Sequence, residues 1–96
     1  MGDFKPISYM PYIDQKLNTK EFIRTFPKDV TSEELVWHRD RNNRIIKVLE
    51  GEGWELQLDD NLPQPLLVGE EIVIPSYTFH RIKRGKTDLK LKIEEY

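Results

Sequence analysis

The chain has 96 residues, which is enough for one domain with a single core and too few for a second. Its formal charge of -2 lacks the positive excess that binding to a phosphate backbone needs, so we expect no nucleic-acid partner, and the absence of cysteine excludes disulfides and thiol chemistry. No apolar stretch approaches the ~20 residues of a membrane span and the amino terminus lacks a signal-peptide pattern, so we expect a cytoplasmic protein with no membrane partner.

The first third of the chain has no clear hydrophobic period. We expect residues 1–18 to form an arm, and residues 1–31 together to supply an arm and a first strand that pack on the remaining part, residues 32–96, within one domain. Residues 19–25 fit a short helix and a strand about equally well, so both alternatives stay open.

From residue 34 onward, the pattern predicts short strands separated by turns. Residues 34–39 and 44–49 are expected to pair as a hairpin across the polar turn between them. Further strands are predicted at 54–59, 71–74, 79–83 and 88–94. The last is the clearest, because Leu89, Leu91 and Ile93 alternate with polar residues. Short antiparallel strands with regular turns are typical of an all-β sandwich or barrel.

The only two histidines, His38 and His80, both fall in or at the edge of predicted strands. The two-residue period of a strand places the side chains of His38 and Asp40 on one face. The predicted hairpin then brings Arg44 back beside Asp40. Whether a site forms depends on whether His80 meets His38 in the fold.

These segments resemble the paired motifs of the cupin superfamily. The first motif is G-x5-H-x-H-x3,4-E-x6-G: His38 falls on its leading His, Asp40 on its second His, Arg44 on its Glu and Gly51 on its closing Gly. The resemblance covers about residues 32–84. It implies a small antiparallel β-barrel, or double-stranded β-helix, of the jelly-roll type, and a homodimer formed through strand exchange.

The second cupin motif is G-x5-P-x-G-x2-H-x3-N, in which Gly69, Pro75 and His80 match at the family spacing. Departures occur in both motifs. Ser32 replaces the first Gly, Asp40 a ligand His, Arg44 the ligand Glu, Tyr77 the Gly before the last His and Arg84 the final Asn. The resemblance is therefore more specific for fold than for function, because this superfold hosts many activities.

One interpretation is a metal site. His38, Asp40 and His80 make two imidazoles and one carboxylate, the ligand set of non-haem Fe(II) oxygenases, so we expect a divalent metal, with Fe(II) as the first candidate. Arg44, or Arg81 if it turns inward, would bind the carboxylate of a small anionic ligand. Arg44 and Tyr77 are the candidate catalytic residues.

A second interpretation is a cupin without metal. A guanidinium beside a divalent cation costs about 4 kcal/mol per unit charge at about 4 Å and an effective dielectric of about 20. Asp40 and Arg44 would then form an ion pair, and the two histidines would line a polar pocket for an anionic molecule or for acid–base chemistry. Such a protein would be a small-molecule binder or a structural or interaction protein, with Trp37 as the candidate contact.

A third interpretation assigns these residues no function. A histidine inside a barrel is often only a satisfied polar group, and an Asp40–Arg44 pair that closes a hairpin contributes ~0 to 1 kcal/mol when solvated. Two histidines at the two motif positions, with none elsewhere in the sequence, make a site as plausible as this interpretation, so both stay open.

Overall fold

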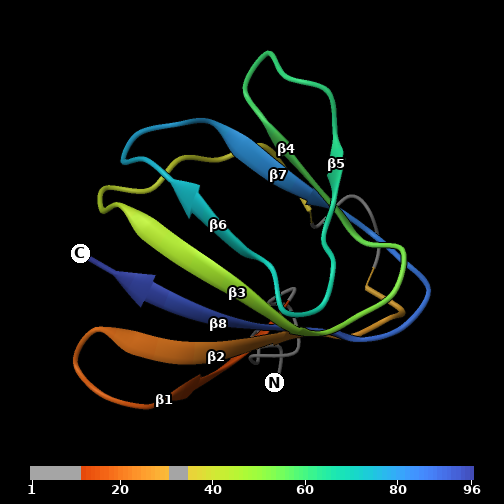
Figure 1. The fold of residues 1–96 in the computed structure, drawn as a ribbon, viewed down its shortest axis with the longest axis horizontal. Helices are drawn as coiled ribbons and strands as arrows, with labels where there is room; N and C mark the ends of the chain where they lie inside the picture. The colour runs from red at the N-terminus through yellow and green to blue at the C-terminus, as the bar shows by residue number, and fades with distance from the viewer. Residues whose placement is uncertain (1–11, 31–34) are drawn as a thin grey trace, which may run out of the picture.

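The computed structural model describes residues 12–30 and 35–96, which form antiparallel strands in two sheets (Figure 1). The five-stranded sheet has the order β1 (Ile13–Lys16), β2 (Glu21–Phe26), β8 (Leu89–Glu95), β3 (Arg44–Glu50) and β6 (Glu71–Ile74). The three-stranded sheet has the order β5 (Gln64–Pro65), β4 (Glu55–Leu58) and β7 (His80–Lys83). The strands of the described residues do not close into a barrel. No helix among the described residues is long and apolar enough to cross a membrane.

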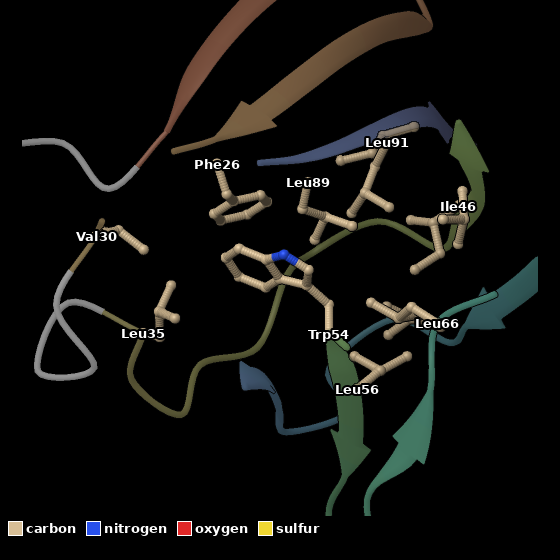
Figure 2. Close-up of a cluster of buried hydrophobic side chains, with 12 residues drawn as sticks. Phe26, Val30, Leu35, Ile46, Trp54, Leu56, Leu66, Leu89 and Leu91 are labelled. Carbon is tan, nitrogen blue, oxygen red and sulfur yellow. The ribbon is translucent and has the colours of Figure 1, made fainter. Parts of the chain in front are cut away.

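The core lies between the two sheets, as Figure 2 shows. Strand β8 supplies Leu89, Leu91 and Ile93, each at most 2 % exposed, which confirms the alternation predicted from the sequence. Trp54, just before β4, is fully buried against Phe26, with ring centroids 5.9 Å apart. Its indole Nε1 donates a 2.7 Å hydrogen bond to the carbonyl of Thr87, so its polar atom is satisfied inside the core.

The predicted hairpin between residues 34–39 and 44–49 is wrong. Strand β3 pairs with β6 on one side and β8 on the other, so both of its edges are occupied. Of residues 35–39, only His38 makes a bridge, and its partner is His80. The side chains explain the outcome: Ile46 and Val48 of β3 are buried, and β8 offers a matching buried row.

The amino-terminal region contributes more regular structure than the sequence indicates. Residues 19–25, left open between helix and strand, contain most of β2, which pairs with β8. The part of the predicted arm that the structure describes contains β1, which pairs with β2 through the register Ile13 to Thr25. Residues 1–11 of the predicted arm lie outside the described residues. The two-residue β5 lies between the predicted strands 54–59 and 71–74, where the sequence predicts no strand.

Candidate metal centre

A backbone bridge brings the two histidines together. The N–H of His38 donates to the carbonyl of His80 at 3.0 Å, and the N–H of His80 donates to the carbonyl of His38 at 2.9 Å. Residues bonded in this way lie directly opposite each other in an antiparallel pair, so their side chains project to the same side. The imidazole centroids are 4.3 Å apart. The sequence left open whether His38 and His80 meet, and this bridge brings them together.

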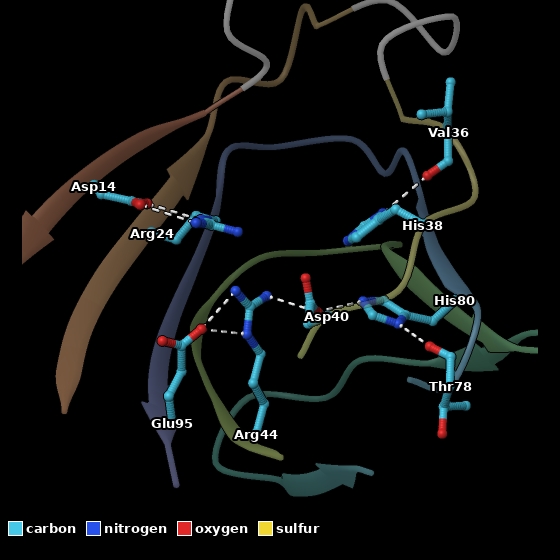
Figure 3. A network of polar contacts seen from close by, with 9 residues as sticks. All are labelled: Asp14, Arg24, Val36, His38, Asp40, Arg44, Thr78, His80 and Glu95. Atoms are coloured by element: carbon cyan, nitrogen blue, oxygen red, sulfur yellow. Dashed lines mark hydrogen bonds and ion pairs between the residues drawn. The ribbon is translucent and has the colours of Figure 1, made fainter. Parts of the chain in front are cut away.

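Backbone carbonyls set the orientation of both imidazoles. Nδ1 of His38 lies 3.0 Å from the carbonyl of Val36, and Nδ1 of His80 lies 2.8 Å from the carbonyl of Thr78 (Figure 3). A carbonyl only accepts, so each Nδ1 carries a hydrogen. In the neutral ring, Nε2 then keeps its lone pair. This tautomer is the one in which histidine binds metals through Nε2 while its other nitrogen donates to an outer group.

Asp40 completes the cluster from the segment after His38. The carbonyl of Asp40 accepts a 2.7 Å hydrogen bond from the N–H of Tyr77, which ties its backbone to the turn before β7. Its Oδ2 lies 3.4 Å from Nε2 of His80. Oδ2 is buried and, among the described residues, has no partner with hydrogen-bond geometry. Ligand atoms of His38, Asp40 and His80 all lie within 4.8 Å of one another.

This cluster fits a cation on its chemistry. Oδ2 of Asp40 and unprotonated Nε2 of His80 are both acceptors, and two acceptors that face each other in a buried place need a proton or a cation between them. Two imidazole nitrogens and one carboxylate oxygen suit divalent first-row metals. His38, Asp40 and His80 are the residues that could hold a metal.

Arg44 lies beside this cluster with its charge already paired. Its Nη1 is 3.1 Å from Oδ2 of Asp40. Its Nε donates to Oε2 of Glu95, at the end of β8, at 2.8 Å, and its Nη2 lies 2.7 Å from the same oxygen in an ion pair. The contact with Asp40 has ion-pair distance without hydrogen-bond geometry, so the contact with Glu95 is the stronger one. Glu95 therefore offsets the positive charge that Arg44 would present to a metal.

The cluster opens into a cavity of about 350 Å³ between the sheets. Most of its wall is apolar, and the polar residues that line it are Arg24, His38, Asp40, Arg44 and His80. Sequence reasoning missed Arg24. Its strand, β2, lies in the segment left open between helix and strand, and a strand assignment would have placed Arg24 on the face of Phe22 and Phe26.

Two other residues considered from the sequence do not line the cavity. The side chain of Tyr77 is largely exposed, and its contact with Asp40 is made by its backbone N–H. Tyr77 has φ 61°, the left-handed region that favours glycine, which is the residue the cupin motif has at this position. Arg81 turns outward, where it donates to Gln57 at 3.0 Å and lies over the ring of Trp37.

Burial lowers the pKa of His80 below the usual value for histidine. Four smaller effects act on the same pKa. The hydrogen bond to Thr78 and the charge of Asp40 raise it, whereas His38 and Arg44 lower it. A lowered pKa keeps the ring neutral at neutral pH. The neutral ring is the form that binds metals.

The sequence matches no protein-family model and no curated protein. The fold, however, is similar to that of MJ0764 of Methanocaldococcus jannaschii, an RmlC-like cupin family protein with a double-stranded β-helix fold. The two sequences are 18 % identical, and the TM-score is 0.67. The match covers 97 % of this chain and 85 % of MJ0764. Protein NMB1881 of Neisseria meningitidis is 17 % identical over 88 % of this chain and 80 % of that one, with a TM-score of 0.59.

A third similar structure is apo-HppE, at 16 % identity and a TM-score of 0.72. This match covers 97 % of the present chain and 52 % of HppE, so the chain spans about half the length of that protein. HppE structures with Fe(II), and with Co(II) and substrate, also match. At identities this low the similarity shows the fold alone: the chain has an all-β, cupin-like double-stranded β-helix architecture.

Proposed function

We propose that the protein is a metal-binding cupin that holds a divalent first-row metal through His38, Asp40 and His80 and acts on a small carboxylate-bearing molecule. Fe(II) is the first candidate metal. The observation that carries the proposal is the pair of facing acceptors, Oδ2 of Asp40 and Nε2 of His80, at 3.4 Å. Both imidazoles are fixed by backbone carbonyls with Nε2 left to bind a cation.

The chemistry that a metal would supply follows from the ligand count. Three protein ligands leave coordination positions open, and in non-haem iron enzymes such positions take oxygen or substrate. Other residues of the chain hold the site in place. The N–H of Tyr77 fixes the backbone of Asp40, and Glu95 fixes Arg44 beside the carboxylate of Asp40. HppE, a similar fold, has been solved with Fe(II), which supports iron as the metal to test first.

A second candidate is a metal-free cupin that binds a small molecule or serves a structural or interaction role. The observation in its favour is the guanidinium of Arg44, whose Nη1 lies 3.1 Å from the oxygen that a metal would use. In this case Arg44 supplies the cation for Asp40. The homodimer and the cytoplasmic location remain predictions under both candidates, and size-exclusion chromatography with light scattering tests the homodimer.

The first experiment is elemental analysis of protein purified without a metal-affinity tag, followed by anaerobic Fe(II) titration. The wild type should bind about one equivalent, as a three-ligand site implies. His80→Ala should weaken binding by about a hundredfold or more, since even outer-shell changes cost 10- to 100-fold. Asp60→Asn is the matched control, because it removes an exposed carboxylate outside the cavity and should bind as the wild type does.

The outcome separates the two candidates. A wild-type protein that carries no metal and binds none on titration contradicts the metal centre and leaves the metal-free binder. Equal metal affinity in the wild type and His80→Ala would place the bound metal elsewhere on the chain.

A further inference from the structure

Arg24 lies on the cavity wall, and part of its guanidinium makes no hydrogen bond with the residues that the structure describes. Its Nε donates to Oδ1 of Asp14 at 2.7 Å and its Nη2 donates to Oδ2 of Asp14 at 2.9 Å. Its guanidinium carbon lies 3.6 Å from the ring centroid of Tyr12. Within the described part of the chain, Nη1 makes no hydrogen bond. Figure 3 shows one end of the guanidinium pointing away from Asp14 toward His38.

Arg44, the other arginine of the cavity wall, is placed differently. All three of its guanidinium nitrogens contact carboxylates, two of them Glu95 and the third Asp40. A ligand carboxylate at Arg44 would therefore compete with Glu95 or Asp40 for the same guanidinium. Arg24 can donate from Nη1 to a ligand and keep both bonds to Asp14.

The remainder of the cavity wall restricts what else the ligand contains. The volume of about 350 Å³ lies within the range of small-molecule sites. The apolar part of the wall is largely aliphatic, formed by Ile46, Leu56, Ile74, Ile82, Leu91 and Ile93. Hydroxyl groups of a sugar or polyol would be buried there without partners, at a cost for each group. The cavity favours a short apolar body.

The charges around the cavity restrict the ligand's charge. The charged side chains at and beside the cavity are two guanidinium groups, on Arg24 and Arg44, and three carboxylates, on Asp14, Asp40 and Glu95. The two guanidinium groups and three carboxylates together leave one excess negative charge. A divalent cation changes the excess to one positive charge, which a single anionic group on the ligand would neutralise. Metal and anion should therefore strengthen each other's binding.

We propose that the ligand of this cavity is a small aliphatic monoanion whose carboxylate is bound by Arg24, while its apolar body lies against the aliphatic wall. This proposal rests on the proposed metal centre and names the substrate class of the same site. Arg24 determines specificity, because it favours a carboxylate over a neutral group of the same shape. Arg44 keeps Asp40 in place.

The test uses Co(II), whose visible spectrum reports on its ligands, and hexanoate as the anion. Calorimetric titration should show that hexanoate binds the Co(II)-loaded protein at least about tenfold more tightly than hexanamide, its neutral analogue, because a charged hydrogen bond is lost with the amide. From butanoate to hexanoate, each added methylene should tighten binding about fourfold. The Co(II) spectrum should change on hexanoate addition only if the anion reaches the metal.

Two variants assign the effect. Arg24→Gln should weaken hexanoate binding about ten- to hundredfold and leave Co(II) affinity unchanged within about twofold. Asp14→Asn is the matched control, because it removes the same ion pair but keeps the guanidinium. It should bind hexanoate at least as tightly as the wild type. If both variants lose hexanoate binding equally, the effect is structural and the role of Arg24 is overturned.

Failure of the metal centre gives a different result. If Co(II) does not bind the wild type, the proposed function fails, and hexanoate is titrated into the metal-free wild type and Arg24→Gln. Weaker binding in the variant would still support Arg24 as the carboxylate-binding residue. Equal binding of hexanoate and hexanamide, in either the loaded or the metal-free protein, would overturn the proposal of a monoanionic ligand.

Discussion

His80 is a buried ionisable side chain, so its protonation couples the site to the stability of the fold. Its pKa in the folded protein is lowered by burial, whereas an unfolded chain has a histidine pKa of about 6.5. Above that pH both states hold a neutral ring, and the fold has its full stability. As the pH falls below about 6.5 toward the lower folded pKa, the unfolded state takes up a proton that the folded state does not.

We predict that the metal-free protein loses stability as the pH is lowered from 7.5 to 5.5, and that His80 causes part of the loss. Urea unfolding at the two pH values measures the effect. His80→Gln, which cannot titrate, should lose less stability over this interval than the wild type. His38 is present in both proteins and serves as an internal control. Parallel losses in wild type and variant would show that His80 does not carry the coupling.

The residues of the proposed metal centre could be predicted from the sequence, because motif spacing points to His38, Asp40 and His80. The groups that surround them could not. Glu95 contacts Arg44 from the end of β8, and Arg24 reaches the cavity from β2. Neither residue lies in a motif, and both are placed only by strand pairings between segments distant in sequence. Local spacing thus points to the residues proposed to bind the metal, whereas the balance of charges around them depends on how distant strands pair.

At the scale of elements, the motif glycines mark positions where the backbone itself is constrained. Gly51 has φ 146° and Gly69 has φ 90°, both in the region that residues with a side chain rarely adopt. Both positions match glycines of the cupin motifs, so the motif spacing coincides with places where the backbone adopts this conformation. The hairpin predicted from residues 34–39 was wrong because alternation indicates which face of a strand is buried but not which strand pairs with it. Segment 19–25 was too short for its period to separate helix from strand.

Two glycines allow strain and crowding to be measured separately. A Cβ at Gly69 would meet no atom within 4 Å, so Gly69→Ala should cost only the left-handed strain, about 1 to 2 kcal/mol. A Cβ at Gly85 would lie 2.5 Å from the backbone nitrogen of Trp54 and also too close to the carbonyl of Glu52. Because backbone cannot give way easily, Gly85→Ala should cost more, about 3 kcal/mol. Chemical denaturation of both variants measures the free energy of unfolding and checks this order. If Gly69→Ala left the free energy of unfolding unchanged, the predicted backbone strain at Gly69 would be wrong.

At the scale of the whole molecule, the cavity lies where the two sheets face each other. Ile46 and Leu91 line it from the five-stranded sheet, while Leu56 and His80 line it from the three-stranded sheet. The proposed ligands come from segments that become neighbours only through the bridge between His38 and His80. An unfolded chain does not hold these groups together. A metal bound here therefore binds the folded state selectively and holds the segment after residue 35 against β7.

We therefore predict that metal stabilises the whole fold and not only the site. Binding to the folded state alone adds about 2.7 kcal/mol when free metal is 100 times Kd, and 1 kcal/mol raises the Tm of a domain of this size by about 4 to 8 °C. Saturating Fe(II) or Co(II) should thus raise the Tm by about 10 to 20 °C in an anaerobic thermal melt followed by circular dichroism. His38→Ala should show almost none of this rise, because two remaining ligands, Asp40 and His80, should bind the metal much more weakly than three. A similar rise in this variant would mean that metal stabilises the protein from somewhere other than the cavity.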